Sequence, residues 1–320
     1  MVQGKGILLV GEPMGLYMAQ QEGNLDEVSS FSLAIAGAEL NVAIGASRLG
    51  HKVGYLTKLG NDFHGKLIVR RLHECGISTE LIQFSDSRPT GIMFKSLTPG
   101  KDPEIFYLRG GSAASTLSSE DVNGLDFSEY GLLHMTGIMP ALSKSTREAS
   151  RLLVEKAKRH GMFFSFDPNL RPQLWPNKKV MITFMNEVAS KADLFLPGLS
   201  EARLLMGEKR AAPEEVARYY KDRGAKAVVV KCGEKGAYYV SDDACGWGET
   251  YPVEQVVDTV GAGDGFAAGI LTALCEGLPL FDAVSRGNAI GGLQIQARGD
   301  NEGLPTCEQL EAYVSQRSHE

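Results

Sequence analysis

Short hydrophobic runs recur along the chain, and they alternate with stretches in which apolar residues return every three to four positions. A continuous apolar run bounded by Gly or polar residues is typical of a strand that is buried on both faces. A repeat of three to four residues is typical of a helix with one face on the core. Strands are therefore expected at 6–12, 53–60, 132–138, 163–169, 194–197 and 227–231. Helices are expected at 36–49, 65–75, 145–159, 213–223 and 266–274.

This alternation of strands and helices predicts an α/β protein with a mostly parallel sheet. Two stretches do not fit the alternation. Residues 14–32 are mixed and polar without a helical period, and the short alternating segments 90–96 and 104–109 flank Pro99–Gly100, which predicts a hairpin. No internal repeat, low-complexity tract or linker divides the sequence, so we expect a single domain over 1–320.

Composition narrows the class of protein and its partners. The net charge of −6, from 33 basic and 39 acidic residues, offers no global attraction to nucleic acid or to an acidic membrane. The apolar run 7–10 is too short for a signal sequence, and no run reaches the ~18 apolar residues of a membrane span. Scattered cysteines without a Cys-x-x-Cys pair favour reduced thiols in the cytoplasm. They are Cys75, Cys232, Cys245, Cys275 and Cys307.

The most specific candidate chemistry lies in the glycine-rich stretch 258–269. Glycines there allow close approach of the backbone, and the helix expected after them would present unpaired N–H groups that suit a phosphate. Asp264 places a carboxylate beside the same anion site, where like charges repel. The carboxylate makes chemical sense if it accepts a proton from a hydroxyl that attacks phosphorus.

These glycine-rich turns are also compared with other motifs of similar sequence. Asp264 could simply cap the helix. A dinucleotide fingerprint that starts at Gly261 is excluded because Phe266 stands where a third Gly is needed. Residues 60–66 nearly match the P-loop motif, but Leu67 stands at the position where that motif needs a Ser or Thr hydroxyl to bind Mg²⁺.

Two segments resemble the signatures of the ribokinase-like (PfkB) carbohydrate kinases. Residues 258–269 are similar to the C-terminal signature, and 36–43 with the following Arg-Leu-Gly at 48–50 are similar to the N-terminal one. The two lie far apart and in the family's order, with matching segments between them. The resemblance implies a ribokinase-like three-layer α/β/α core and a small β-sheet lid, formed by segments of about 13–35 and 88–112.

The same resemblance implies a kinase that uses ATP and Mg²⁺, and it leaves a requirement for a monovalent cation such as K⁺ open. Asp264 would be the general base, and the backbone N–H groups of Gly261, Ala262 and Gly263 would form the anion hole. Mg²⁺ would be held mostly through water that Glu201 organises. The nucleotide is expected against Asn169, Lys231, Gly233, Gly236, Gly263 and Asn288.

The substrate is suggested by three further segments. Residues 167–171 carry a pattern shared by the family's fructokinases and 2-keto-3-deoxygluconate kinases, whereas 107–115 and 298–306 resemble the latter enzymes. Arg109 and Arg171 would suit an anionic sugar acid better than a neutral sugar, because an unpaired buried cation is costly. Expected substrate contacts are Gly37, Asn41, Tyr107, Arg109, Arg171 and Asp300.

The favoured function is transfer of the γ-phosphoryl group of ATP to the 6-hydroxyl of 2-keto-3-deoxygluconate. A fructokinase or another neutral-sugar kinase is the alternative, with both Arg residues in structural ion pairs. A sugar-binding regulator that has lost its chemistry is a more remote one. Two positions depart from the family pattern: Met93 replaces a lid Tyr, and Gly198 replaces the Asn of an Asn-x-x-Glu motif. ATP and the sugar acid are the expected small-molecule partners, and a homo-oligomer through the lid is expected as well.

Overall fold

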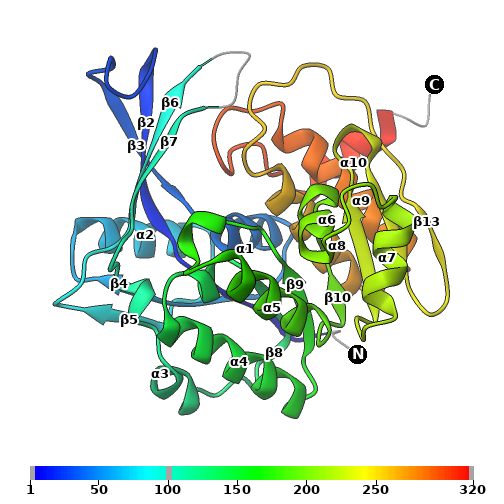
Figure 1. The fold of residues 1–320 in the computed structure, drawn as a ribbon. Coiled ribbons are helices and arrows are strands. Elements are labelled where there is room, and N and C mark those ends of the chain that lie inside the picture. Colours follow the sequence, from blue (N-terminus) through cyan, green and yellow to red (C-terminus); the bar gives the residue numbers. More distant parts are fainter. Residues whose placement is uncertain (1–3, 99–102, 317–320) are drawn as a thin grey trace.

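A sheet of nine strands forms the centre of the structure (Figure 1). The computed structural model describes residues 4–98 and 103–316, so the hairpin turn expected at Pro99–Gly100 lies outside the described residues. All neighbouring strands from β11 to β5 pair in parallel, and β12 and β13 extend the sheet in antiparallel pairing. The strand order is β13 (Cys245–Trp247), β12 (Ala237–Val240), β11 (Ala227–Lys231), β10 (Leu194–Phe195), β9 (Phe163–Asp167), β8 (Tyr130–Thr136), β1 (Gly6–Val10), β4 (Val53–Gly60) and β5 (Ile82–Ser85).

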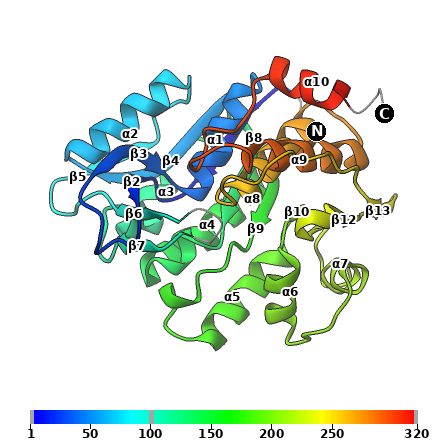
Figure 2. The same cartoon turned by 90° about the horizontal axis from the view of Figure 1, so that it is seen from above.

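Helices cover both faces of this sheet (Figure 2). Successive side chains of β1 pack into hydrophobic cores on opposite faces of the sheet. Ile7 and Leu9 pack with one helical layer, and Leu8 and Val10 pack with the other. One layer holds α1 (Ala38–Arg48), α2 (Phe63–Glu74), α8 (Ala262–Cys275), α9 (Leu280–Gln294) and α10 (Cys307–Gln316). The other holds α3 (Ser119–Asn123), α4 (Lys144–Arg159), α5 (Lys178–Ala189), α6 (Leu199–Met206) and α7 (Pro213–Lys221). Within the described ranges, no helix has both the length and the apolar character needed to cross a bilayer.

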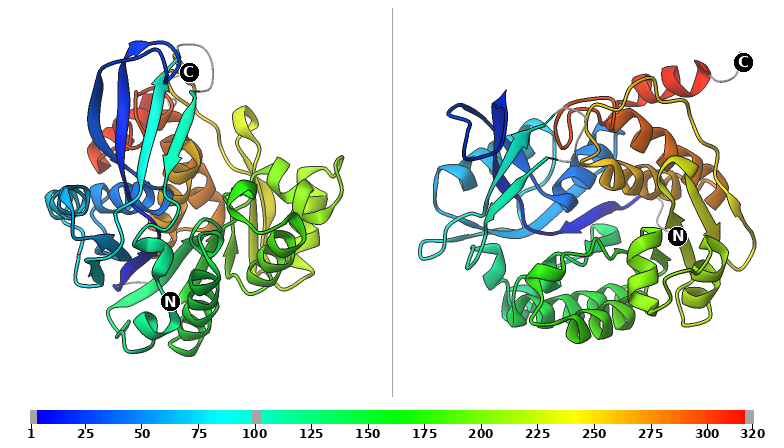
Figure 3. Two further views of the ribbon diagram at one scale, coloured as in Figure 1. Left: turned by 60° about the vertical axis from the view of Figure 1, so that its left-hand side comes forward. Right: turned by 45° about the horizontal axis from the view of Figure 1, so that its top comes forward.

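A second, four-stranded sheet projects from the core at one end of the central sheet (Figures 1 and 3). Its two middle strands run parallel, and each outer strand is antiparallel to its neighbour. Its strands, in order, are β3 (Phe31–Ala36), β2 (Met14–Glu22), β6 (Ile92–Leu97) and β7 (Ile105–Leu108). The expected three-layer core with a small β-sheet lid is therefore confirmed.

The structure differs from the sequence pattern in a few elements. The expected strand 194–197 is regular only at Leu194–Phe195, since Pro197 has no N–H to donate to the ladder, although the Pro197 carbonyl still accepts from the N–H of Lys231. Helix α9 is not predicted by the pattern, because its glycines interrupt the hydrophobic repeat. One of those glycines, Gly287, proves to be a packing position, as described below. The pattern also does not predict β5, β12, β13, α3, α5, α6 and α10.

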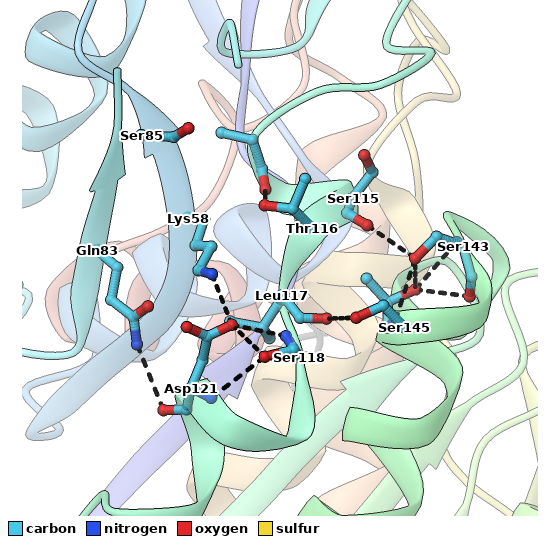
Figure 4. A network of polar contacts seen from close by, with 12 residues as sticks. Lys58, Gln83, Ser85, Ser115, Thr116, Leu117, Ser118, Asp121, Ser143 and Ser145 are labelled. Carbon is cyan, nitrogen blue, oxygen red and sulfur yellow. Dashed lines mark hydrogen bonds and ion pairs between the residues drawn. The ribbon is translucent and has the colours of Figure 1, made fainter. Parts of the chain in front are cut away.

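The chain that leaves the lid after β7 is fixed to the core by a network of polar contacts (Figure 4). Ser118 and Asp121 form a reciprocal capping box at the start of α3, and Lys58 of β4 pairs with the Asp121 carboxylate. Ser143 and Ser145, at the start of α4, donate to the carbonyls of residues 115 and 117. The lid is thus anchored at a defined place on the core.

Helix α8 packs closely against both α1 and α9 because small residues face one another there. A Cβ atom added to Gly45 of α1 would lie 2.8 Å from the Cβ of Ala268. One added to Gly269 would lie 2.9 Å from the Cα of Gly287 in α9. These contacts leave no space for larger side chains, and they set the position of the N-terminus of α8.

Substitution of Gly269 by Ala should therefore force α8 and α9 apart. Overpacking of this kind costs about 1–3 kcal/mol, so the free energy of unfolding should fall by that amount in urea denaturation. Gly124→Ala is the matched control, because a Cβ atom there would meet nothing within 4 Å. Equal stability of the two variants would contradict the packing described for α8.

Candidate active site

Charged side chains gather where three parallel strands of the central sheet end. Glu12 follows β1, Asp167 ends β9 and Lys231 ends β11. The carboxyl ends of parallel strands meet at one edge of a sheet, which is where α/β proteins bind their ligands. The N-terminus of α8 lies at the same edge, because the residues around it line a cavity together with these three side chains. The residues around the N-terminus are Thr259, Val260, Gly261, Gly263 and Asp264.

The turn that opens α8 presents its backbone to this cavity. Gly261 adopts a left-handed φ of 81°, and a Cβ atom there would lie 2.2 Å from the carbonyl oxygen of Asp300. Only glycine combines that conformation with so close a contact. The N–H groups that follow in the first turn have no carbonyl partner within the helix, and they carry its positive dipole end. The turn is therefore suited to hold an anion.

The Asp264 carboxylate lies in that first turn and is held by one strong hydrogen bond. Asn41 of α1 donates its amide to the carboxylate at 2.8 Å, and the amide oxygen of Asn41 accepts from Asn301 at 3.1 Å. Burial raises the pKa of Asp264 to about 8, with a further contribution from the charge of Asp167, although the Asn41 bond and Lys231 oppose the shift. A carboxylate with so high a pKa is a competent proton acceptor near neutral pH.

A second titratable carboxyl group is buried nearby. Glu39 of α1 is 1% exposed, and its Oε1 atom accepts a hydrogen bond from Thr136 at 2.6 Å. Burial raises the pKa of Glu39 to about 7, and the bond from Thr136 opposes this shift. Among the described residues its Oε2 atom has no hydrogen-bond partner. Glu39 also contributes to the raised pKa of Asp264.

Two cavities meet at Lys231, Thr259 and Gly263, which line both of them. The first has a volume of about 310 Å³ and reaches from the turn of α8 to the lid. The second has a volume of about 650 Å³ and runs along α8 and α9. Asp264 lines the first cavity close to this junction. A small molecule in one cavity and an extended one in the other would therefore meet beside Asp264.

Three cations line the first cavity, and two of them are already paired. Arg109, which follows β7, donates to Glu12 at 2.7 Å, and Ser112 donates to the other oxygen of the same carboxylate. Lys231 is paired with Asp167. Arg171 donates to the carbonyl oxygen of Leu170 at 2.9 Å, and none of the described carboxylates pairs with it. Arg171 is thus available to bind an anionic ligand.

The other expected substrate residues also lie at this cavity, some with their polar groups engaged. Asp300 is paired with Lys95 at 2.9 Å, and the two ends of the Asn41 amide bind Asp264 and Asn301. The ring of Tyr107 lies under the Arg109 guanidinium, 5.3 Å from its centroid. Gly37, an expected substrate contact, also lines the cavity. So does Met93, where the sequence departs from the family pattern.

The positions expected at the nucleotide divide between the cavities. Asn169 lines the first cavity beside Arg171. Its backbone adopts a left-handed φ of 33°, and its N–H donates to Asp167. The second cavity is mostly apolar, with Phe266, Val256 and Ile295 in its walls. The expected residues at this second cavity are Lys231, Gly233, Gly236, Ala262, Gly263 and Asn288.

Glu201 has both carboxylate oxygens bound to backbone N–H groups. One accepts from Leu170 at 2.6 Å and the other from Gly198 at 2.8 Å, so Glu201 caps α6 and fixes the turn after β9. The described residues contain no group of three His, Cys, Asp or Glu side chains arranged to hold a metal ion. Asp167, Glu201 and Asp264 nevertheless offer carboxylate oxygens at one cavity, which fits Mg²⁺ that keeps its own water and binds phosphates.

Sequence reasoning did not assign Glu12, Asn301, Lys95 or Asp258 to the site. Glu12 could have been found, because it follows a buried strand at the carboxyl edge as Asp167 does. Asn301 lies next to Asp300 in a segment that the resemblance marked, but its bond to Asn41 becomes visible only in the structure. No local pattern marks Lys95. Asp258 lies inside the glycine-rich stretch, but its partner Lys95 becomes visible only in the structure.

Comparisons with known proteins agree with this geometry. Residues 5–307 match the family described as pfkB family carbohydrate kinase. The chain is 45% identical over 306 residues to a 2-dehydro-3-deoxygluconokinase of Bacillus subtilis, covering 95% of this chain and 94% of that protein. It is 30% identical to a probable fructokinase-2 of Arabidopsis thaliana, covering 96% and 95%.

The fold comparison agrees. A crystal structure of an E. coli protein in complex with ATP and Mg²⁺ has a TM-score of 0.88 and is 26% identical, covering 98% of this chain and 99% of that one. The family model matches nearly the whole length of this chain, and the chain has the ribokinase-like fold. The chain therefore belongs to the pfkB family of carbohydrate kinases.

Proposed function

We propose that the protein is an ATP-dependent sugar-acid kinase that phosphorylates the 6-hydroxyl of 2-keto-3-deoxygluconate, which is the same compound as 2-dehydro-3-deoxygluconate. The observation that carries the substrate is Arg171, a cation in the sugar-sized cavity without a carboxylate partner among the described residues. Arg171 is half-buried, and an anionic substrate gains a charge-assisted hydrogen bond there that a neutral hexose does not. The higher identity to a 2-dehydro-3-deoxygluconokinase than to a fructokinase supports the same choice.

The proposed chemistry is in-line transfer between the two cavities. The sugar acid lies in the first cavity with its carboxylate on Arg171 and its 6-hydroxyl at Asp264. Asp264 accepts the hydroxyl proton as the sugar oxygen bonds to the γ-phosphorus, while the bond from that phosphorus to the β,γ-bridging oxygen breaks and ADP leaves. Asn41 holds the Asp264 carboxylate in place. The N–H groups of residues 261–264 stabilise charge on the transferring group.

The remaining residues position the nucleotide and the metal ion. The apolar walls of the second cavity take the base of ATP, and Lys231 lies at the junction where the phosphates meet the sugar. Mg²⁺ supplies positive charge to the phosphate oxygens when it is bound, and Glu201 and Asp167 are the residues that would hold its water. Tyr107, Arg109 and Met93 of the lid cover the sugar and exclude water.

Arg109 has a different proposed role from Arg171. Its charge is balanced by Glu12, so the pair acts as a fixed donor that orients the sugar rather than as a free cation. Asp300 and Gly37 contact the remaining hydroxyl groups and backbone face of the sugar. We place the enzyme in the cytoplasm, a proposal supported by five cysteines that are all unpaired.

The substrate is tested by an assay of ADP release with Mg-ATP, comparing 2-keto-3-deoxygluconate with fructose, for the wild type and Arg171→Gln. A charge-assisted hydrogen bond contributes about 1.5–3 kcal/mol, so kcat/KM for the sugar acid should fall about 10- to 150-fold. Residual activity on fructose should not change, because fructose carries no carboxylate. The exposed Arg210→Gln is the control variant. If fructose is the better substrate and both variants behave like the wild type, a neutral-sugar kinase replaces our proposal.

The pH dependence tests the role of Asp264. Only the carboxylate form accepts a proton, so kcat/KM should rise with pH and level off above about 8, the pKa raised by burial. Asp264→Asn should lower kcat about 10²- to 10⁴-fold. Glu39→Gln should keep the transition but move it to lower pH, because the charge of Glu39 contributes to the raised pKa of Asp264. An unchanged profile in Asp264→Asn would exclude Asp264 as the base.

The same pKa has a thermodynamic consequence that needs no substrate. The folded protein keeps the Asp264 proton up to about pH 8, whereas the unfolded chain releases it near 3.8, so wild-type stability falls as pH rises through this range. The difference in melting temperature between Asp264→Asn and the wild type should therefore shift in favour of the variant from pH 4 to pH 8. Above pH 8 this difference should stay constant. A constant difference would contradict the raised pKa.

We also propose that two copies associate through their lids. Phe106 and Leu108 of β7 alternate with cavity-lining residues and are both 52% exposed, and Leu33 of β3 is 46% exposed. Phe106 and Leu108 line a hollow together with Phe31 and Phe94. This outer face of the lid is apolar, as an interface core is.

Sedimentation of Phe106→Asp tests this interface. The variant should sediment as a monomer where the wild type sediments as a dimer, because a charge at the centre of an apolar interface is costly. Phe84→Asp, at an equally exposed aromatic residue of β5, should leave the assembly unchanged. A monomeric wild type, or a dimer that survives Phe106→Asp, would contradict association through the lid.

A further inference from the structure

Lys95 is a buried lysine on the lid that the proposed mechanism does not use. It lies on β6 two residues after Met93, so the two side chains share the face of the strand that turns to the cavity. The side chain of Lys95 is 6% exposed. A lysine is rarely buried to this degree without a partner, which directs attention to what its ammonium group contacts.

The ammonium group of Lys95 bridges two carboxylates of the core. It lies 2.6 Å from an oxygen of Asp258 and 2.9 Å from an oxygen of Asp300. Burial alone would lower the pKa of Lys95, but the two carboxylates outweigh it and raise the pKa, so the group stays charged. Each partner is more than a hundred residues away in the sequence, and the bridge joins the lid to the core.

Both carboxylates belong to the two loops that shape the anion hole. Asp258 accepts from the N–H of Val260 at 3.1 Å and from the N–H of Gly299 at 3.3 Å, which joins the loops. Gln294 donates to the carbonyls of the same two residues. The Asp300 carbonyl packs directly on Gly261, the first residue of the turn. A shift of either carboxylate therefore moves the turn that opens α8.

The same loops are connected to the proposed base. Asn301, next to Asp300, donates to Asn41, which in turn donates to Asp264. A second contact ties this segment to the lid, because Arg298 donates to the carbonyl of Ala19 in β2 at 2.6 Å. Both middle strands of the lid are thus attached to the segment 298–301.

From these contacts we propose that Lys95 is a positioning residue for phosphoryl transfer. Its ammonium group, carried by the lid, holds the loops around Asp258 and Asp300 together and thereby sets the anion hole and the Asn41–Asp264 pair. A lid displaced from the cavity leaves two buried carboxylates without their cation, so the anion hole is complete only when the lid covers the sugar. This inference rests on the proposed kinase activity, but not on which sugar is the substrate.

The test uses Lys95→Ala, Lys95→Met and Lys95→Arg in the full-length protein, with whichever sugar the wild type phosphorylates best. Displacing catalytic groups by about 1 Å can cost 10²-fold, so we expect kcat to fall about 10²-fold in the Ala and Met variants. KM for ATP should change little, because Lys95 does not line the nucleotide cavity. Lys95→Arg should keep most of the activity, and exposed Lys66→Ala should keep all of it.

Chemical rescue separates the charge of Lys95 from its packing. Methylammonium, ethylammonium or K⁺ should restore part of the lost kcat in Lys95→Ala, where space opens between the carboxylates, and none in Lys95→Met. The wild type should not respond to these cations. Melting temperatures identify a variant that does not fold. If Lys95→Ala does not fold, the kcat of Lys95→Met tests the proposal instead. Wild-type kcat in Lys95→Ala, or a folded Lys95→Ala that no cation restores, would overturn the proposal. A wild type without activity on any sugar would instead refute the proposed function.

Discussion

The structure depends on the requirement that a charge withdrawn from water be paired. Most of the ionised groups at the carboxyl edge of the central sheet obey it: Glu12 with Arg109, Asp167 with Lys231, and Asp258 and Asp300 with Lys95. An unpaired buried charge would cost several kcal/mol, so these pairs fix the positions of strands, loops and lid relative to one another. Two of the groups that lack a charged partner lie where the reacting molecules are proposed to bind. Arg171 has no described carboxylate partner, and Asp264 has only the neutral amide of Asn41.

Those two exceptions are what give the cavity its chemistry. The pKa of Asp264 is raised because burial and neighbouring carboxylates disfavour its charge, and a proton from a sugar hydroxyl relieves that cost. Arg171 is relieved when an anion binds. The close contacts of α8 with α1 and α9 keep Asp264 in position, since small residues permit approach but no further adjustment. Packing and electrostatics therefore support the same small region.

Much of this organisation could be predicted from the sequence, because it rests on local patterns. Apolar runs and the helical repeat locate most of the central strands, and the glycine-rich turn with Asp264 identifies the reacting centre. Other parts depend on distant partners. The pairing of Arg109 with Glu12 could not be anticipated, and it changes Arg109 from a free cation to a balanced one. Lys95 carries no local signal at all, and the glycines of α9 conceal its hydrophobic repeat.

The central claim is that a carboxylate on the substrate completes the charge balance at Arg171. It is tested most directly by comparing kcat/KM for 2-keto-3-deoxygluconate with that for its C1 carboxamide, which has the same hydroxyl groups but no charge. We predict that the acid is preferred about 10- to 150-fold, the value of one charge-assisted hydrogen bond. Equal values for the two compounds would show that Arg171 does not read the carboxylate, and the assignment to a sugar acid would then be wrong.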